Sequence, residues 1–532
     1  MRPAPPLLHI KPPFMHTSGN SKRIAKNTLL LYGRMALTML VALFTSRVVL
    51  QALGVTDFGI YNVVGGVVAM MGFLNGSLGG ATSRFITYEL GLGGRGNVRH
   101  IFRCAVSIHY LLAALVLVVA ETVGLWFVLE KLVIPDGRMT AALWAYQCSV
   151  LTVVVTIISS PYNALIIAHE RMSAFAYISI LEVFLKLGIV YLLMAVGIDR
   201  LILYATLLLV VQVSIRFIYS GYCSRHFPET SGRWLWDRRK SREIFSYAGW
   251  TLNGNLAVMG YTQGINILLN LFFGPAVNAA RAISVQVQSA AYQFFNNFLT
   301  AVRPQITKSY AQGDLPYMHK LILSSSKYGA YLFLIIAVPL LSNTSYVLSL
   351  WLGQVPAHTV AFTQLMLLTC MNSVLKMPTL MGIHATGDIK RFQIVEGSLL
   401  LTVVPIAYAF LKWRHIQPET VFIIYLLVET VTQFARVWIV FPRIQMKRRL
   451  YFTHVLFPLI FTCLPLVAFG FTMSWFFPAH NFSSLIRNIS IALPFTLLCI
   501  GFLGMHQEER KYFSSKIRSA LTRLKNYRHK PN

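Results

Sequence analysis

Basic side chains lie inside long apolar stretches of this 532-residue sequence, where a charge is costly. A charge at the centre of a bilayer costs about 3 kcal/mol on insertion scales, so cations at such positions are informative. Arg34 lies about a turn and a half inside the first apolar stretch, and Arg281 lies in a strongly polar run of a later one. Guanidinium groups bind phosphate through paired donors, and Lys376 is a further cation that could assist them. These three residues predict an anionic ligand.

Polar side chains accompany these cations on neighbouring stretches. The stretch at about 244–271 has a polar stripe on one helical face, formed by Thr251, Asn255, Thr262, Asn266 and Asn270. On the next stretch, Gln288 shares a face with Arg281. Because lipid satisfies such side chains poorly, we predict a water-filled cavity lined by these residues. The alternative is hydrogen bonding between helices within one bundle.

Carboxylates within the apolar stretches suggest a second chemistry. Glu182 and Lys186 are four residues apart on one helical face, as in a structural ion pair, although a transport role stays open. Glu396 and Glu429 could bind a coupling proton or sodium ion. The sequence has no Gly-x-x-x-x-Gly-Lys-Ser/Thr motif, and its six cysteines show no CxxC spacing. We therefore predict no catalytic residues, no metal and no cofactor.

Three glycines, Gly72, Gly76 and Gly80, recur at a four-residue spacing in the second apolar stretch. This spacing is typical of helices that pack closely in membranes, and it predicts such packing here. A bending point during transport is the alternative.

The composition requires lipid as the solvent of these stretches. Hydrophobic residues make up 55% of the chain and charged residues only 12%, about half the usual share of a soluble domain. We predict an all-α integral membrane protein with about fourteen transmembrane helices. They lie near 28–50, 58–80, 104–129, 141–166, 173–196, 200–223, 244–271, 275–301, 325–351, 359–382, 392–412, 420–441, 454–477 and 485–505.

The distribution of charge predicts the topology. The formal net charge is +29, and the Lys and Arg residues cluster in every second segment between apolar stretches. By the positive-inside rule, these basic segments and both termini are cytoplasmic. No basic domain stands apart from the stretches, so nucleic acid is not a predicted partner.

A weak internal repeat divides the chain. A shift of 220 residues places Ile86-Thr87 on Ile306-Thr307 and Gly93 on Gly313. Parallel repeats of this kind form two pseudo-repeated lobes around a central cavity. The predicted parts are a disordered segment 1–23, an N-terminal lobe 24–223 with helices 1–6, a basic linker 224–242, a C-terminal lobe 243–442 with helices 7–12, extra helices 13–14 at 443–505 and a basic tail 506–532.

Three segments resemble the polysaccharide exporters of the multidrug/oligosaccharidyl-lipid/polysaccharide (MOP) superfamily. The first segment, 45–64, contains Gly-Val-Thr-Asp-Phe-Gly-Ile-Tyr; the others are 81–91 and 303–314. The chain looks like a Wzx-type flippase over about residues 24–505. Peptidoglycan lipid flippases of this superfamily have cavity arginines in their first and eighth helices, and Arg34 and Arg281 match them by helix rather than by a local motif.

This resemblance implies a function and a location. It implies that undecaprenyl-diphosphate-linked oligosaccharide units cross the cytoplasmic (inner) membrane of a bacterium by alternating access, for O-antigen- or capsule-type polysaccharide. The implied partners are this lipid-linked oligosaccharide, membrane lipids and other polysaccharide-assembly proteins. A multidrug/cation antiporter of the same superfamily is one alternative. A membrane polysaccharide polymerase or ligase is another, although the short outside loops provide few catalytic groups.

Overall fold

The computed structural model describes residues 18–69, 72–130, 134–135, 137–195, 199–232, 235–414 and 417–511, and within these ranges it contains helices and no strand. The predicted segment 1–23 and tail 506–532 lie largely outside them. The helices are α1 Ser18–Ala69, α2 Gly72–Gly91, α3 Val98–Val119, α4 Leu125–Glu130, α5 Met139–Ala168, α6 Met172–Ala195, α7 Arg200–His226, α8 Arg238–Phe273, α9 Pro275–Ala311, α10 Leu315–Ser342, α11 Thr344–Leu352, α12 Thr359–Thr386, α13 Lys390–Leu401, α14 Val403–Arg414, α15 Glu419–Arg443, α16 Arg448–Tyr451, α17 Phe457–Phe476 and α18 Phe482–Cys499.

Eleven helices of the described chain are long and apolar enough to cross a membrane. One of them, Val98–Glu130, joins α3 to α4 through a π-helical turn. The three other predicted spans, near 28–50, 58–80 and 275–301, fall in α1, in the second part of α1 with α2, and in α9. The membrane-protein class and the all-α architecture are confirmed, and the number of fourteen spans stays a prediction.

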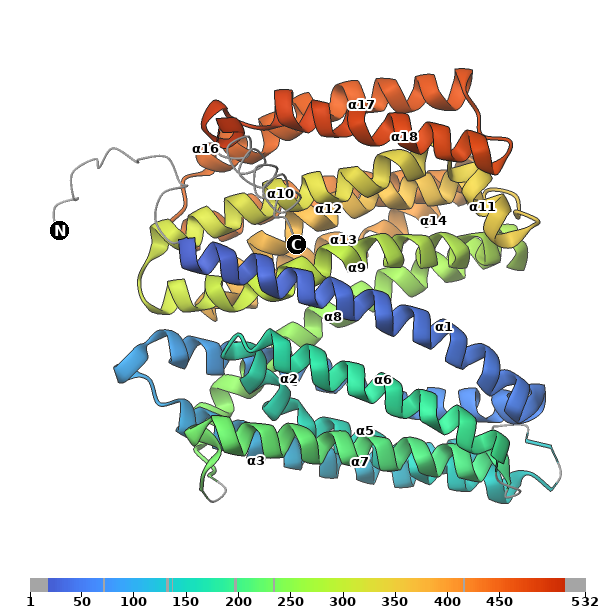
Figure 1. The fold of residues 1–532 in the computed structure, drawn as a ribbon, viewed down its shortest axis with the longest axis vertical. Helices are drawn as coiled ribbons and strands as arrows, with labels where there is room; N and C mark the ends of the chain where they lie inside the picture. Colours follow the sequence, from blue (N-terminus) through green and yellow to red (C-terminus); the bar gives the residue numbers. More distant parts are fainter. Residues whose placement is uncertain are drawn as a thin grey trace, which may run out of the picture.

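The helices form two bundles (Figure 1). In the first bundle, α1 packs against α5 and α6, and α5 packs against α7. In the second bundle, α9 packs against α12 and α10, and α13 packs against α8 and α15. Helices α17 and α18 lie on the outside of the second bundle, against α10. The two bundles meet where α2 contacts α8 and α9, and where α1 contacts α9.

An arginine clamp ties three helix ends of the first bundle together. α1 bends at Gly54, whose φ of 76° lies in the left-handed region that glycine tolerates. Three residues later, Asp57 accepts a hydrogen bond of 2.9 Å from Arg138 Nε, just before α5. Arg138 also pairs with Asp199, which caps the first turn of α7. The Gly-x-x-Asp segment of the sequence is therefore a structural joint.

A buried ion pair attaches the last helices to the second bundle. Lys327 of α10 donates to Glu509, after α18, at 2.6 Å, and both residues are buried. Tyr328 donates to the same carboxylate at 3.0 Å, and Tyr331 donates to the carbonyl of Gly504 at 2.7 Å. Burial of two charges is tolerated because they neutralise each other and are hydrogen-bonded. Helix α18 finishes at the end of the second bundle where α1 begins (Figure 1), and the ion pair follows it there.

Candidate binding cavity between the bundles

A cavity of about 270 Å³ lies between the bundles, where α2, α8, α9 and α12 meet. We call it the deep cavity. Its walls are Gly76, Gly80, Ser83, Arg84 and Thr87 from α2; Tyr247, Thr251 and Asn255 from α8; Arg303, Pro304 and Thr307 from α9; and Met377, Leu380, Met381 and His384 from α12. Helices of both bundles therefore line one polar space.

Small side chains on α2 leave room for this cavity. Gly76, Gly80, Ser83 and Thr87 recur at three- or four-residue intervals and so lie on one helical face. A Cβ atom at Gly72, Gly76 or Gly80 would meet no atom within 4 Å. The prediction of close helix packing at these three glycines is therefore wrong, because the face that they form borders open space.

Two arginines line the deep cavity from different bundles, Arg84 on α2 and Arg303 on α9. Arg84 donates hydrogen bonds to the backbone carbonyls of His384, at 3.2 Å, and Ala385, at 2.9 Å. Arg303 is exposed although it lies on α9 between the bundles, because its side chain borders the cavity. In the described part of the chain, neither guanidinium forms an ion pair with a carboxylate. Two unneutralised cations at such a site attract an anion.

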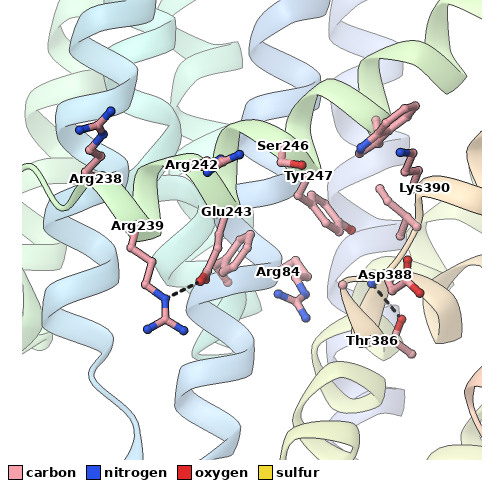
Figure 2. A pocket seen from close by; sticks show the side chains of 14 residues that line it. Arg84, Arg238, Arg239, Arg242, Glu243, Ser246, Tyr247, Thr386, Asp388 and Lys390 are labelled. Carbon is pink, nitrogen blue, oxygen red and sulfur yellow. Dashed lines mark hydrogen bonds and ion pairs between the residues drawn. The ribbon is translucent and has the colours of Figure 1, made fainter.

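A wider pocket of about 850 Å³, which we call the mouth, adjoins the deep cavity; the two share Arg84 and Tyr247 (Figure 2). Its charged side chains are Arg84, Arg238, Arg239, Arg242, Lys390, Glu243 and Asp388. Glu243 pairs with Arg239 at 3.5 Å, as the dashed line in Figure 2 shows, and Asp388 pairs with Arg443 at 3.3 Å. Five cations against two carboxylates make the mouth basic. Trp250 adds an aromatic face, 5.1 Å from the Lys390 ammonium.

Asn255 of the predicted site lies in the wall of the deep cavity, as does Thr251 of the same predicted stripe. Its amide donates to the hydroxyl of Ser77 on α2 at 3.1 Å, so it also connects the two bundles. The predicted stripe on α8 thus reaches the cavity at its Thr251 and Asn255 end.

The far end of that stripe serves the second bundle. Arg281 is buried and donates to the backbone carbonyl of Thr262 at 3.0 Å and to the side-chain oxygen of Asn266. Gln288 donates to the carbonyl of Met366 on α12 at 3.1 Å. These contacts match the alternative reading of the stripe, in which polar groups bond within one bundle.

Arg34 lies within the first bundle. Its guanidinium is 3.4 Å from the hydroxyl of Ser179 on α6, and it stacks over the ring of Phe175 at 4.7 Å. The structure therefore does not bring Arg34 and Arg281 together in the deep cavity, whose lining contains neither of them.

The remaining predicted residues form ion pairs. Lys376 pairs with Glu396, and Arg436 joins Glu396 at 2.9 Å to Glu429 at 3.0 Å, in a buried network across α12, α13 and α15. With two cations and two carboxylates, this network is neutral. On α6, Lys186 donates to Glu182 at 2.6 Å. The carboxylates that could bind a coupling ion each have a cationic partner in this structure.

Arg84 and Arg303 were not predicted from the sequence, although both lie in segments that carry the resemblance. The internal repeat contains the missing signal: Arg84 precedes Ile86-Thr87 by two residues, and Arg303 precedes Ile306-Thr307 by three. The two arginines therefore occupy nearly equivalent places in the two repeats. Arginines one residue apart in the register of the two repeats are compatible with a site between the lobes.

The fold is similar to that of solved MATE proteins. It is similar to the crystal structure of a MATE point mutant, with a TM-score of 0.67, 13% identity and coverage of 81% of this chain and 98% of that chain. An outward-facing MATE family multidrug resistance transporter of the MOP superfamily gives a TM-score of 0.66 at 15% identity, over 80% of this chain and 96% of that one. A MOP superfamily transporter from Pyrococcus furiosus, described by a reversed polarity of its binding pocket, gives 0.63 at 15% identity, over the same shares.

The chain belongs to the family described as polysaccharide biosynthesis protein, whose model matches residues 24–322. The match begins in α1 and ends in α10, so it includes both arginines of the deep cavity. No match was found among curated protein sequences. The comparisons therefore show the polysaccharide biosynthesis family and a fold similar to that of MATE transporters.

Proposed function

We propose that the protein is a flippase that moves undecaprenyl-diphosphate-linked oligosaccharide units across the cytoplasmic (inner) membrane of a bacterium. The units would serve O-antigen- or capsule-type polysaccharide synthesis. The observation that carries this proposal is the pair Arg84 and Arg303, which face one cavity from both bundles without a carboxylate partner in the described chain. A diphosphate supplies the negative charge that such a pair lacks, and guanidinium groups bind it through paired donors.

The shape of the site suggests how the substrate is arranged. The diphosphate binds Arg84 and Arg303, and the sugars occupy the larger mouth, where Trp250 and Tyr247 offer apolar ring faces beside polar groups. The polyprenyl chain stays in lipid, because moving its methylene groups from the membrane into the protein would not lower their free energy. Rocking of the two bundles then exposes the headgroup on the opposite side.

Three other groups of predicted residues take different roles in this proposal. Arg34 and Arg281 hold helices within their own bundles, since their donors are directed to neighbouring helices. The network of Lys376, Glu396 and Glu429 stabilises the second bundle, and it can take up a coupling ion only in a state in which Arg436 has moved away. Glu182 and Lys186 form a local ion pair.

Purified protein in liposomes that contain lipid-linked oligosaccharide tests the proposal. Transfer of the headgroup between leaflets is expected for the unchanged protein and is expected to fall at least tenfold for Arg84→Gln and for Arg303→Gln. Arg391→Gln is the matched control, because Arg391 is exposed and absent from the lining of both pockets. Unchanged transfer by both cavity variants would reject the assignment, and formation of a glycosidic bond instead of transfer would indicate a polymerase or ligase.

A multidrug/cation antiporter is the second candidate, because the similar MATE structures include a multidrug resistance transporter. The charge of the cavity opposes this reading, since two uncompensated arginines repel a cationic drug. Export of a cationic dye from cells that overproduce the protein would favour the antiporter, and an Arg84→Gln variant would then export the dye better.

A further inference from the structure

The turn between α5 and α6 connects the two bundles on the other side of α9 from the deep cavity. Glu170 in this turn accepts a hydrogen bond from Lys308 Nζ at 2.8 Å and another from Gln305 Nε2 at 2.8 Å. Lys308 and Gln305 belong to α9 of the second bundle, whereas Glu170 belongs to the first. Both oxygens of one carboxylate thus bind across the bundle boundary.

This contact is buried and conformationally specific. The Glu170 side chain is 2% exposed, and its φ of 58° lies in the left-handed region that few non-glycine residues adopt. Such a backbone persists only where the surroundings hold it, and here the neighbouring His169 ring stacks on Phe227 at 4.3 Å. Tyr317 donates to the Gln305 side-chain oxygen at 3.2 Å and so fixes the amide that faces Glu170.

Helices α2 and α9 approach each other closely beside this contact. A Cβ atom on Gly91, at the end of α2, would lie 2.6 Å from Ala311 Cβ and 2.9 Å from the Lys308 backbone. The bundles are therefore shut here by both packing and charge. The face of α9 that carries Arg303 and Thr307 borders the deep cavity, while Gln305 and Lys308 hold the first bundle. The same segment of α9 therefore lines the deep cavity and binds Glu170.

We propose that Glu170 is the positioning residue of a gate: with Lys308 and Gln305 it latches the two bundles at this end, and the latch must open before the bundles can separate and the deep cavity can widen around a headgroup. The role of this latch in transport rests on the proposed function, whereas the contact between the bundles does not. A pair of opposite charges suits a reversible latch, because both groups are hydrated when the bundles separate, whereas an apolar contact would be penalised by exposure to water.

The test measures the distance between the bundles without any substrate. Spin labels on non-natural amino acids at the exposed positions 225, at the end of α7, and 312, after α9, leave the six native cysteines in place. Glu170→Gln removes the charge, and Gly91→Ala inserts a methyl group as a wedge. We expect both variants to raise the population of long distances about fivefold or more in detergent-free nanodiscs.

Matched variants decide whether the charges close the gate. Glu508→Gln makes the same chemical change at an exposed carboxylate after α18 and is expected to leave the distances unchanged. The exchange Glu170→Lys with Lys308→Glu restores opposite charges and is expected to return the short distance. The proposal is overturned if Gly91→Ala lengthens the distance while Glu170→Gln does not, if neither does, or if the exchange fails to restore closure. The distance measurement needs no substrate, so it can succeed even if the liposome assay fails. If the latch opens as expected but the protein transfers no lipid-linked oligosaccharide, the proposed function is refuted and the latch is not.

Discussion

The Nη2 atom of Arg84, on α2 of the first bundle, lies 2.9 Å from the carbonyl oxygen of Ala385, at the end of α12 in the second bundle. The last carbonyls of a helix have no partner within it and carry partial negative charge, so they are natural acceptors for a guanidinium. This contact gives Arg84 two roles, since the same donors that would bind a diphosphate now connect the bundles. Arrival of the anion would therefore compete with a contact between the two halves of the protein.

Replacement of Arg84 by lysine tests whether paired donors matter or only charge. Lysine keeps the positive charge but is a point donor and cannot bind two oxygens in one plane. We expect Arg84→Lys to transfer lipid-linked oligosaccharide about tenfold more slowly, as loss of one hydrogen bond to a charged group predicts. The measurement is the rate of transfer in liposomes at equal protein content. A lysine variant as fast as the unchanged protein would show that charge alone suffices.

The sequence predicted the class of the fold because hydropathy and charge distribution act over whole stretches of the chain. It did not predict which polar faces meet, because a stripe such as Thr251 to Asn270 has the same periodicity whether it faces water or another helix. Asn255 faces the cavity, yet Asn266, eleven residues later on the same face, binds Arg281. Arg34 was selected because it lies deep in an apolar stretch. The arginines that line the deep cavity, Arg84 and Arg303, lie nearer to the ends of their helices.

The network around Arg436 predicts a large effect on stability. Arg436 is 1% exposed and pairs with Glu396 and Glu429. Arg436→Met leaves Glu429 without its cation in a buried place, and we expect the free energy of unfolding to fall by about 3–5 kcal/mol. Thermal unfolding of the purified protein in detergent measures this change. The double variant Arg436→Met with Glu429→Gln should recover part of the loss; an equal or larger loss would contradict the electrostatic explanation.

The Lys327–Glu509 pair predicts how the last helices are held. Glu509→Gln removes one charge and leaves the buried Lys327 ammonium uncompensated, so the segment after Gly504 should separate from α10 more readily. Limited proteolysis should then cleave near Met505 several times faster than in the unchanged protein. The double variant Lys327→Met with Glu509→Leu replaces the pair by apolar groups and should restore resistance. If Glu509→Gln is cleaved no faster than the unchanged protein, the ion pair does not hold this segment.

Acid should weaken the clamp of Arg138. The hydrogen bond and charge of Arg138 lower the pKa of Asp199 in the folded protein. A carboxyl whose folded pKa is depressed contributes stability that is fully present above its unfolded pKa, about 3.9, and is lost as the pH falls through its folded pKa. Stability should therefore decline below about pH 4, and Arg138→Met should flatten that part of the profile. Thermal unfolding of both proteins in detergent between about pH 3 and pH 6 measures the difference. Parallel profiles would assign the acid sensitivity to other carboxylates, because the variant lacks the cation that depresses the pKa of Asp199.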